Sequence, residues 1–169
     1  MPSDAMIAAA RDLLDLCKRK KLTLTTAESC TGGLLAATLT EIPGSSQVID
    51  GAFVSYSNAA KQKMLGVPAD TLKAYGSVSR QTAEAMAKGA LAHSAVDLAV
   101  SITGIAGPAG GTPGKPIGLV HFAVASRASQ LVHRERKFGA IGRSEVRNQS
   151  VLQALAMLRE IAESEGAKA

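Results

Sequence analysis

The chain is poor in aromatic residues and in cysteine, and each shortage narrows the class of protein. Its 169 residues contain no Trp and only 3% aromatic residues, so the core must be packed from Ala, Val, Leu and Ile. Cys17 and Cys30 form neither a CxxC motif nor a Cys/His cluster, which argues against a disulfide framework and a zinc site. The 46% hydrophobic content suffices for a core, and we expect one α/β domain over residues 1–169.

Long apolar runs are lacking as well. No segment approaches the ~20 consecutive apolar residues that cross a bilayer, and no basic-then-apolar leader opens the sequence. We therefore expect a cytoplasmic location and no membrane partner. The net charge is +5, but Lys and Arg are spread thinly and are not interleaved with aromatic residues. This pattern predicts no nucleic-acid partner and favours a phosphate-bearing small molecule.

Hydrophobic periodicity predicts strands that alternate with helices. The predicted strands cover residues 22–28, 46–57, 96–103, 117–126 and 130–138. The predicted helices cover residues 3–21, 32–42, 59–65, 80–94 and 143–163. Asn58 is the expected N-cap of the third helix.

This alternation indicates a three-layer α/β/α sandwich with a mixed, mainly parallel sheet of five or six strands. The sheet is mixed because the short connection at residues 127–129 forces the last two strands into an antiparallel hairpin. The apolar run "AVSIT" at 99–103 is typical of a central strand. The alternating run "LVHRERKF" at 131–138 is typical of an edge strand.

The stretch "ESCTGG" at residues 28–33 places Ser29 where a strand turns into a helix. We expect unpaired main-chain N–H groups from Cys30 to Gly33 to receive an anion or a developing oxyanion there. Simple helix capping by Ser29 or Thr31 is the alternative. The P-loop, GxGxxG and GxSxG spacings are absent, which argues against those nucleotide-binding and hydrolase classes.

A nucleophilic Ser29 needs a base, and lysine is a better candidate than histidine. The histidines fall within predicted strands or at a helix end, positions typical of structural or surface residues. Lys61 and Lys63 are two residues apart on a predicted helix, so they point about 200° apart and at most one enters a pocket. The phenol of Tyr56 would orient Lys61 or relay a proton. Alternatively, both lysines are solvated.

Two further features could form part of a site. Arg143 and Arg147 share one helix face, where a phosphate or carboxylate would bind unless both are ordinary surface residues. The glycine- and proline-rich segment at 104–116 links two predicted strands, and loops in that position commonly shape sites. Acidic residues do not cluster with metal-ligand spacing, so no metal is expected.

These motifs resemble, in order, those of the C-terminal domain of CinA, the competence/damage-inducible protein family, including its stand-alone nicotinamide mononucleotide deamidases. The matching stretches are "TAESCTGG", "IPGSS", "GAFVSYSNAAKQKMLGV", "GSVS", "SITGIAGPAGGTPGKPIGLV" and "GRSEVR", which span nearly the whole chain. Relatives often carry Asp where this chain has Gly142. The resemblance implies a three-layer α/β/α fold with a mixed sheet.

The resemblance also implies an activity. It is the hydrolysis of the carboxamide of nicotinamide mononucleotide to nicotinate mononucleotide and ammonia, with no metal and no cofactor. The implied catalytic residues are Ser29 as nucleophile, Lys61 as base and Tyr56 as a supporting hydroxyl. The implied substrate-site residues are Thr31, Gly32, Gly33, Thr103, Gly104 and Arg143.

Two other functions remain open at this point. One is a non-catalytic module that binds a nucleotide or phosphate through the helix N-terminus and the glycine-rich loop. The other is a metal-dependent nucleotide pyrophosphatase, against which the scattered carboxylates argue. Ala-rich helix surfaces favour self-association, so a homodimer is also expected. No role follows from the sequence for Glu28, Cys30 or Arg147.

Overall fold

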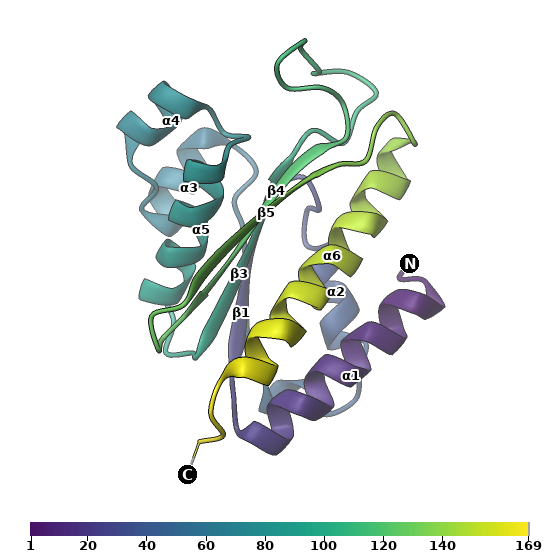
Figure 1. The fold of residues 1–169 in the computed structure, drawn as a ribbon, viewed down its shortest axis with the longest axis vertical. Coiled ribbons are helices and arrows are strands. Elements are labelled where there is room, and N and C mark those ends of the chain that lie inside the picture. The colour runs from purple at the N-terminus through teal and green to yellow at the C-terminus, as the bar shows by residue number, and fades with distance from the viewer. Residues whose placement is uncertain (169) are drawn as a thin grey trace.

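A five-stranded sheet with the order β2-β1-β3-β4-β5 organises the computed structural model, which describes residues 1–168 (Figure 1). The strands are β1 (Leu24–Glu28), β2 (Ile49–Val54), β3 (Leu98–Gly104), β4 (Leu119–Ser126) and β5 (Leu131–Lys137). β1 pairs in parallel with β2 and β3, whereas β4 is antiparallel to β3 and to β5. Four of the five strands therefore point the same way, and the predicted mixed, mainly parallel sheet with its terminal hairpin is confirmed.

Helices cover both faces of this sheet, which confirms the predicted three-layer sandwich (Figure 1). The helices are α1 (Asp4–Lys20), α2 (Leu34–Thr40), α3 (Asn58–Leu65), α4 (Ala69–Tyr75), α5 (Arg80–Ala92) and α6 (Arg143–Ser164). α1, α2 and α6 lie on one face, and α3, α4 and α5 lie on the other. Within residues 1–168, no helix combines the length and the apolar character needed to cross a bilayer.

The two faces of the sheet are packed with side chains of different size. Large apolar residues such as Leu155 and Phe122 fill the space under α1 and α6. Ala83 and Ala87 of α5 meet Ala123 of β4, and these small side chains allow the helix to lie close to the sheet. β3 is buried along almost its whole length and β5 is partly exposed, as expected of a central and an edge strand.

Two details of the helices on the α5 face differ from the prediction. Helix α4 was not predicted, because its seven residues bury only Leu72 and are too few to show a helical period. The prediction that Asn58 caps α3 is wrong. The hydroxyl of Ser57 accepts the N–H of Ala60 at 3.0 Å, so Ser57 is the cap and Asn58 is the first helical residue.

Helix α2 and strand β2 are both shorter than predicted. Gly32 and Gly33 have φ angles of +57° and +98°, in the left-handed region that favours glycine, so α2 begins only at Leu34. β2 begins at Ile49 because the preceding residues Ser45–Gln47 form a 3₁₀ turn. The first difference affects function, since it leaves a non-helical turn after Ser29.

The carboxyl ends of β1, β2 and β3 bring the candidate chemistry to one edge of the sheet. Ser29 directly follows β1, Ser55 directly follows β2, and Thr103 lies next to the end of β3. In open α/β sheets, ligands bind in crevices at the carboxyl ends of parallel strands. Helix α3 returns Lys61 to the same edge.

Gly89 sets the distance between α3 and α5. A Cβ atom at this position would overlap the carbonyl group of Leu65, the last residue of α3. Lys61 lies one helical turn before Leu65, so the close packing of α3 against α5 also determines the position of the lysine.

We expect Gly89→Ala to lower the free energy of unfolding by roughly 1–3 kcal/mol, because the added methyl group must push α3 away from α5. Gly51→Ala is the matched control, since a Cβ atom there has open space around it. Denaturant unfolding measures both variants. Helix propensity alone would make Gly89→Ala more stable, so a Gly89→Ala protein at least as stable as the wild type would contradict the tight contact.

Candidate active site

Ser29 and Lys61 form a buried hydrogen-bonded pair. The Lys61 Nζ lies 2.9 Å from the Ser29 Oγ. The main-chain N–H of Ser29 donates to the carbonyl of Ile102 at 2.9 Å, which ties the serine to β3. Lys61 is 1% exposed, whereas Lys63, two residues along α3, faces solvent. The structure therefore brings together the two residues that a lysine-activated serine requires.

All three hydrogen-bond partners of the Lys61 amine are neutral. Besides Ser29, the Nζ donates to the main-chain carbonyls of Ser55 at 2.7 Å and Tyr56 at 3.2 Å. Burial lowers the pKa of the Lys61 amine from its usual 10.5 to about 8. A neutral amine has two N–H groups for the two carbonyls and one lone pair, which is then left for the Ser29 hydroxyl. These partners therefore suit an amine that accepts the serine proton.

We expect this burial to make stability depend on pH. Between pH about 8 and 10.5 the unfolded chain holds a proton on Lys61 that the folded protein has released, so the free energy of unfolding rises with pH. The rise is roughly 3 kcal/mol for this group. Denaturant unfolding of wild type and Lys61→Met at pH 7 and pH 10.5 measures it. A wild-type-minus-variant difference that is the same at both pH values would contradict the lowered pKa.

The turn after Ser29 has fewer free N–H groups than predicted. The N–H of Gly32 donates to the Ser29 carbonyl at 3.0 Å, and that of Gly33 donates to the Glu28 carboxylate at 3.2 Å. Within residues 1–168, the N–H groups of Cys30 and Thr31 donate to no other residue, and the Cys30 N–H lies near its own thiol. The expected anion cradle is therefore reduced to these two consecutive donors.

Glu28 caps helix α2, a role that the sequence suggested for Ser29 or Thr31. Its buried carboxylate accepts the N–H groups of Leu35 at 2.9 Å and Ala36 at 3.0 Å, as well as that of Gly33. Capping by the side chain of Ser29 or Thr31 is wrong, because α2 has no side-chain cap bond from its own N-cap, Gly33. The positive end of α2 is thus already occupied by a protein anion.

A cavity of about 280 Å³ opens in front of Ser29. Its lining includes four further residues of the predicted site, Tyr56, Thr103, Gly104 and Arg143. Thr31, Gly32 and Gly33 do not line it, and Lys61 lies behind Ser29 rather than in the cavity wall. The cavity lies just below the volume range usual for small-molecule sites.

Arg143 links three parts of the cavity rim. Its Nη1 donates to the Gly107 carbonyl in the glycine-rich loop, and its Nη2 donates to the Tyr56 phenol, both at 2.9 Å. The phenol therefore contacts Arg143, and it is the main-chain carbonyl of Tyr56 that contacts the Lys61 amine. Elsewhere in the cavity lining, the Thr103 hydroxyl donates to the Ser77 carbonyl at 2.7 Å and fixes that segment.

The histidines lie elsewhere. His121 and His133 contact each other at 2.9 Å across β4 and β5, and His93 bonds the carbonyl of Gly89 at the end of α5. Burial lowers the pKa of both His121 and His133. These contacts agree with the prediction that the histidines are structural or surface residues and not the catalytic base. In the described residues 1–168, no three His, Cys, Asp or Glu side chains are grouped as metal ligands.

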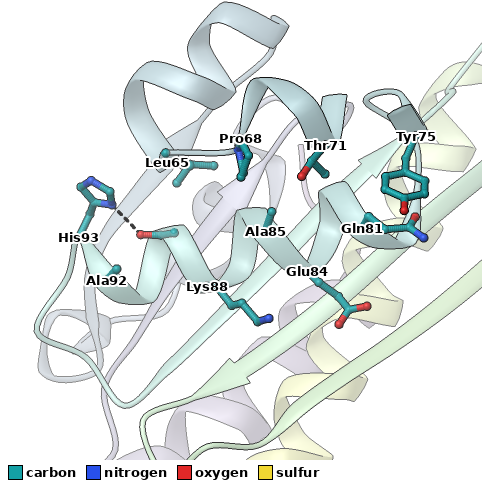
Figure 2. Close-up of a pocket in the computed structure, with 12 residues that line it drawn as sticks. Leu65, Pro68, Thr71, Tyr75, Gln81, Glu84, Ala85, Lys88, Ala92 and His93 are labelled. Atoms are coloured by element: carbon teal, nitrogen blue, oxygen red, sulfur yellow. Dashed lines mark hydrogen bonds between the residues drawn. The ribbon is translucent and has the colours of Figure 1, made fainter. Parts of the chain in front are cut away.

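A larger hollow, of about 630 Å³, lies between α4 and α5 (Figure 2). Leu65, Pro68 and Ala85 form its apolar floor, and Glu84 and Lys88 stand at its rim. It contains none of the predicted site residues and no nucleophile paired with a base. Size alone therefore does not identify the site, and the smaller cavity at Ser29 is the candidate.

Comparison with known proteins decides the family. The sequence profile of the CinA C-terminal domain matches residues 7–162. The chain belongs to this family. A putative competence-damage inducible protein of Symbiobacterium thermophilum is 47% identical over 151 residues, covering 85% of this chain and 35% of that protein. A CinA-like protein of Mycolicibacterium gilvum is 52% identical over 137 residues, covering 81% and 32%. The chain thus spans about a third of the length of these curated CinA relatives.

Solved structures of the family share the fold over their full length. The competence/damage inducible protein CihA of Agrobacterium tumefaciens is 48% identical with a TM-score of 0.94, covering 98% of this chain and 99% of that one. A CinA superfamily protein of Klebsiella pneumoniae is 34% identical with a TM-score of 0.90, covering 95% and 99%. The resemblance seen in the sequence motifs is confirmed at the level of the CinA family.

Proposed function

We propose that this CinA-family chain is an amidase that hydrolyses the carboxamide of nicotinamide mononucleotide to nicotinate mononucleotide and ammonia. The observation that carries the proposal is the 2.9 Å contact between the buried Lys61 amine and the Ser29 hydroxyl, beside a cavity. The names of the relatives refer to competence and damage induction and not to a reaction. The support is therefore the chemistry of the site together with the motifs that resemble the deamidases.

The neutral amine of Lys61 takes the hydroxyl proton as the Ser29 Oγ bonds to the carboxamide carbon. The negative charge on the carboxamide oxygen is received by the N–H of Cys30, which lines the cavity, together with the N–H of Thr31, the next residue in the turn. Collapse of this intermediate breaks the C–N bond, and Lys61 returns its proton to the departing ammonia. A water molecule then gives a proton to Lys61 as its oxygen bonds to the ester carbon, and Lys61 passes that proton to the Ser29 Oγ as the C–O bond breaks and the carboxylic acid leaves.

The substrate's charges match the arrangement of the cavity. A pyridinium ring withdraws electrons from its carboxamide, and its positive charge disfavours the protonated form of Lys61. The nucleotide phosphate would bind toward Arg143 and the glycine-rich loop, which lie together on the rim. This assignment agrees with α2, whose positive end is already neutralised by Glu28 and is not free for the phosphate.

The two alternative functions fit the site less well. A module that only binds nucleotides has no use for a lysine buried against a serine, since burying that amine costs free energy. A metal-dependent pyrophosphatase needs carboxylates around its substrate, and the residues that line the cavity include no Asp or Glu. A homodimer and a cytoplasmic location stay predictions.

We expect Ser29→Ala to reduce ammonia release from nicotinamide mononucleotide by roughly 10⁴-fold or more, because the covalent route is lost. Lys61→Met should lose a comparable factor, since the base is removed. Lys63→Met is the matched control on the same helix and should keep wild-type turnover, because Lys63 is exposed. Ammonia is measured by a coupled assay on proteins with verified thermal unfolding. Turnover of Ser29→Ala within tenfold of wild type would remove Ser29 from the nucleophile role.

A further inference from the structure

Two charged residues to which the sequence assigns no role, Glu28 and Arg147, hold the turn that carries Ser29 at two different points. Glu28 precedes the serine and binds three N–H groups, from Gly33, Leu35 and Ala36. It thereby fixes the far end of the turn where helix α2 begins. The Glu28 carboxylate makes no hydrogen bond to Cys30 or Thr31, which form the middle of the turn.

Arg147 supplies the contact in the middle of the turn. Its Nη2 donates to the Thr31 carbonyl at 2.9 Å, from a position 116 residues later in the chain. A Cβ atom on Gly32 would lie 3.7 Å from the same Nη2, so the guanidinium lies against the main chain of the turn. The Thr31 carbonyl also accepts the N–H of Leu34 at 3.0 Å. Two donors therefore fix the orientation of this one carbonyl.

The contact between Arg147 and the Thr31 carbonyl matters because two N–H groups beside it stay available to a ligand. Within residues 1–168, the N–H groups of Cys30 and Thr31 donate to no other residue, and they directly follow the nucleophile. The Thr31 carbonyl shares a planar peptide group with the Gly32 N–H, which donates to the Ser29 carbonyl, so holding the carbonyl fixes the peptide group that directly follows the Thr31 N–H. Burial raises the pKa of the Cys30 thiol to about 12, and both the Cys30 N–H and, to a smaller extent, the Arg147 charge act in the opposite direction.

We propose that Arg147 is a positioning residue, which holds the Cys30 and Thr31 N–H groups in the orientation that receives the oxyanion. The identity of the natural substrate in this inference rests on the proposed function. The positioning role concerns the reactivity of Ser29, which can be measured without that substrate. Arg147 touches the turn and lines no part of the cavity. Its removal therefore weakens stabilisation of the transition state and leaves substrate binding nearly unchanged.

An alkyl fluorophosphonate tests this without the natural substrate. The Ser29 Oγ bonds to phosphorus, the P–F bond breaks, fluoride leaves with the electron pair and Lys61 takes the proton. We expect Arg147→Met to slow this labelling roughly 30- to 100-fold, as misplaced catalytic groups typically do. Arg147→Lys keeps a cationic donor, so this variant should be labelled at least tenfold faster than Arg147→Met. Arg159→Met, at an exposed ion pair on the same helix, is the control and should label at the wild-type rate.

Intact-mass spectrometry gives the labelling rates, and peptide mapping confirms Ser29 as the site. With nicotinamide mononucleotide, the Arg147→Met protein should lose the same factor in kcat with KM within threefold of wild type. If the wild type labels at Ser29 with the expected Arg147 dependence but releases no ammonia, the proposed substrate fails and the positioning role stands. A labelling rate of Arg147→Met within threefold of wild type, or a loss confined to KM, would overturn the positioning role.

Discussion

The enclosure of the Lys61 amine among neutral partners is the constraint on which the rest of the site depends. An ammonium group buried against two carbonyls and a hydroxyl lacks a counter-ion, so the protein favours the uncharged amine. The fold maintains this through details far from the reacting atoms. Ser57 starts α3 in the right place, and Gly89 lets the other end of that helix pack against α5.

Charged side chains are arranged in a consistent pattern around the turn that carries Ser29. The Glu28 carboxylate, which is bonded to the turn, faces the start of α2 and is neutralised there by main-chain N–H groups. Arg143 and Arg147 come from the first two turns of α6 and reach the cavity rim and the turn respectively. The cavity thus has its cation at the rim and a base of lowered pKa behind the serine. That layout suits a substrate with a positive ring and a negative phosphate.

Much of the fold followed from periodicity, because a buried strand and a one-sided helix leave patterns in sequence. The central position of β3, the edge position of β5 and the hairpin between β4 and β5 were all predicted correctly. Helix α4 was missed because a seven-residue helix with one buried side chain leaves no such pattern.

The site was only partly predictable from the sequence. Most of the correct predictions came from the family motifs. Residue type and spacing singled out Ser29 and Lys61, while their contact depends on how β1 and α3 meet in space. The contact of Arg147 spans 116 residues and no local rule reveals it. Glu28 is different: an acid a few residues before a helix is a signal for capping, and it was overlooked in favour of Ser29 and Thr31.

The most direct test of the central claim is the ionisation of the Lys61 amine itself. Lysine side chains labelled with ¹³C and ¹⁵N can be titrated by NMR, with the Lys61 signal assigned by its absence in Lys61→Met. A midpoint of about 8 is the expected result. A midpoint near the usual 10.5 would mean that the amine stays protonated when the reaction needs it neutral, and Lys61 could not serve as the base.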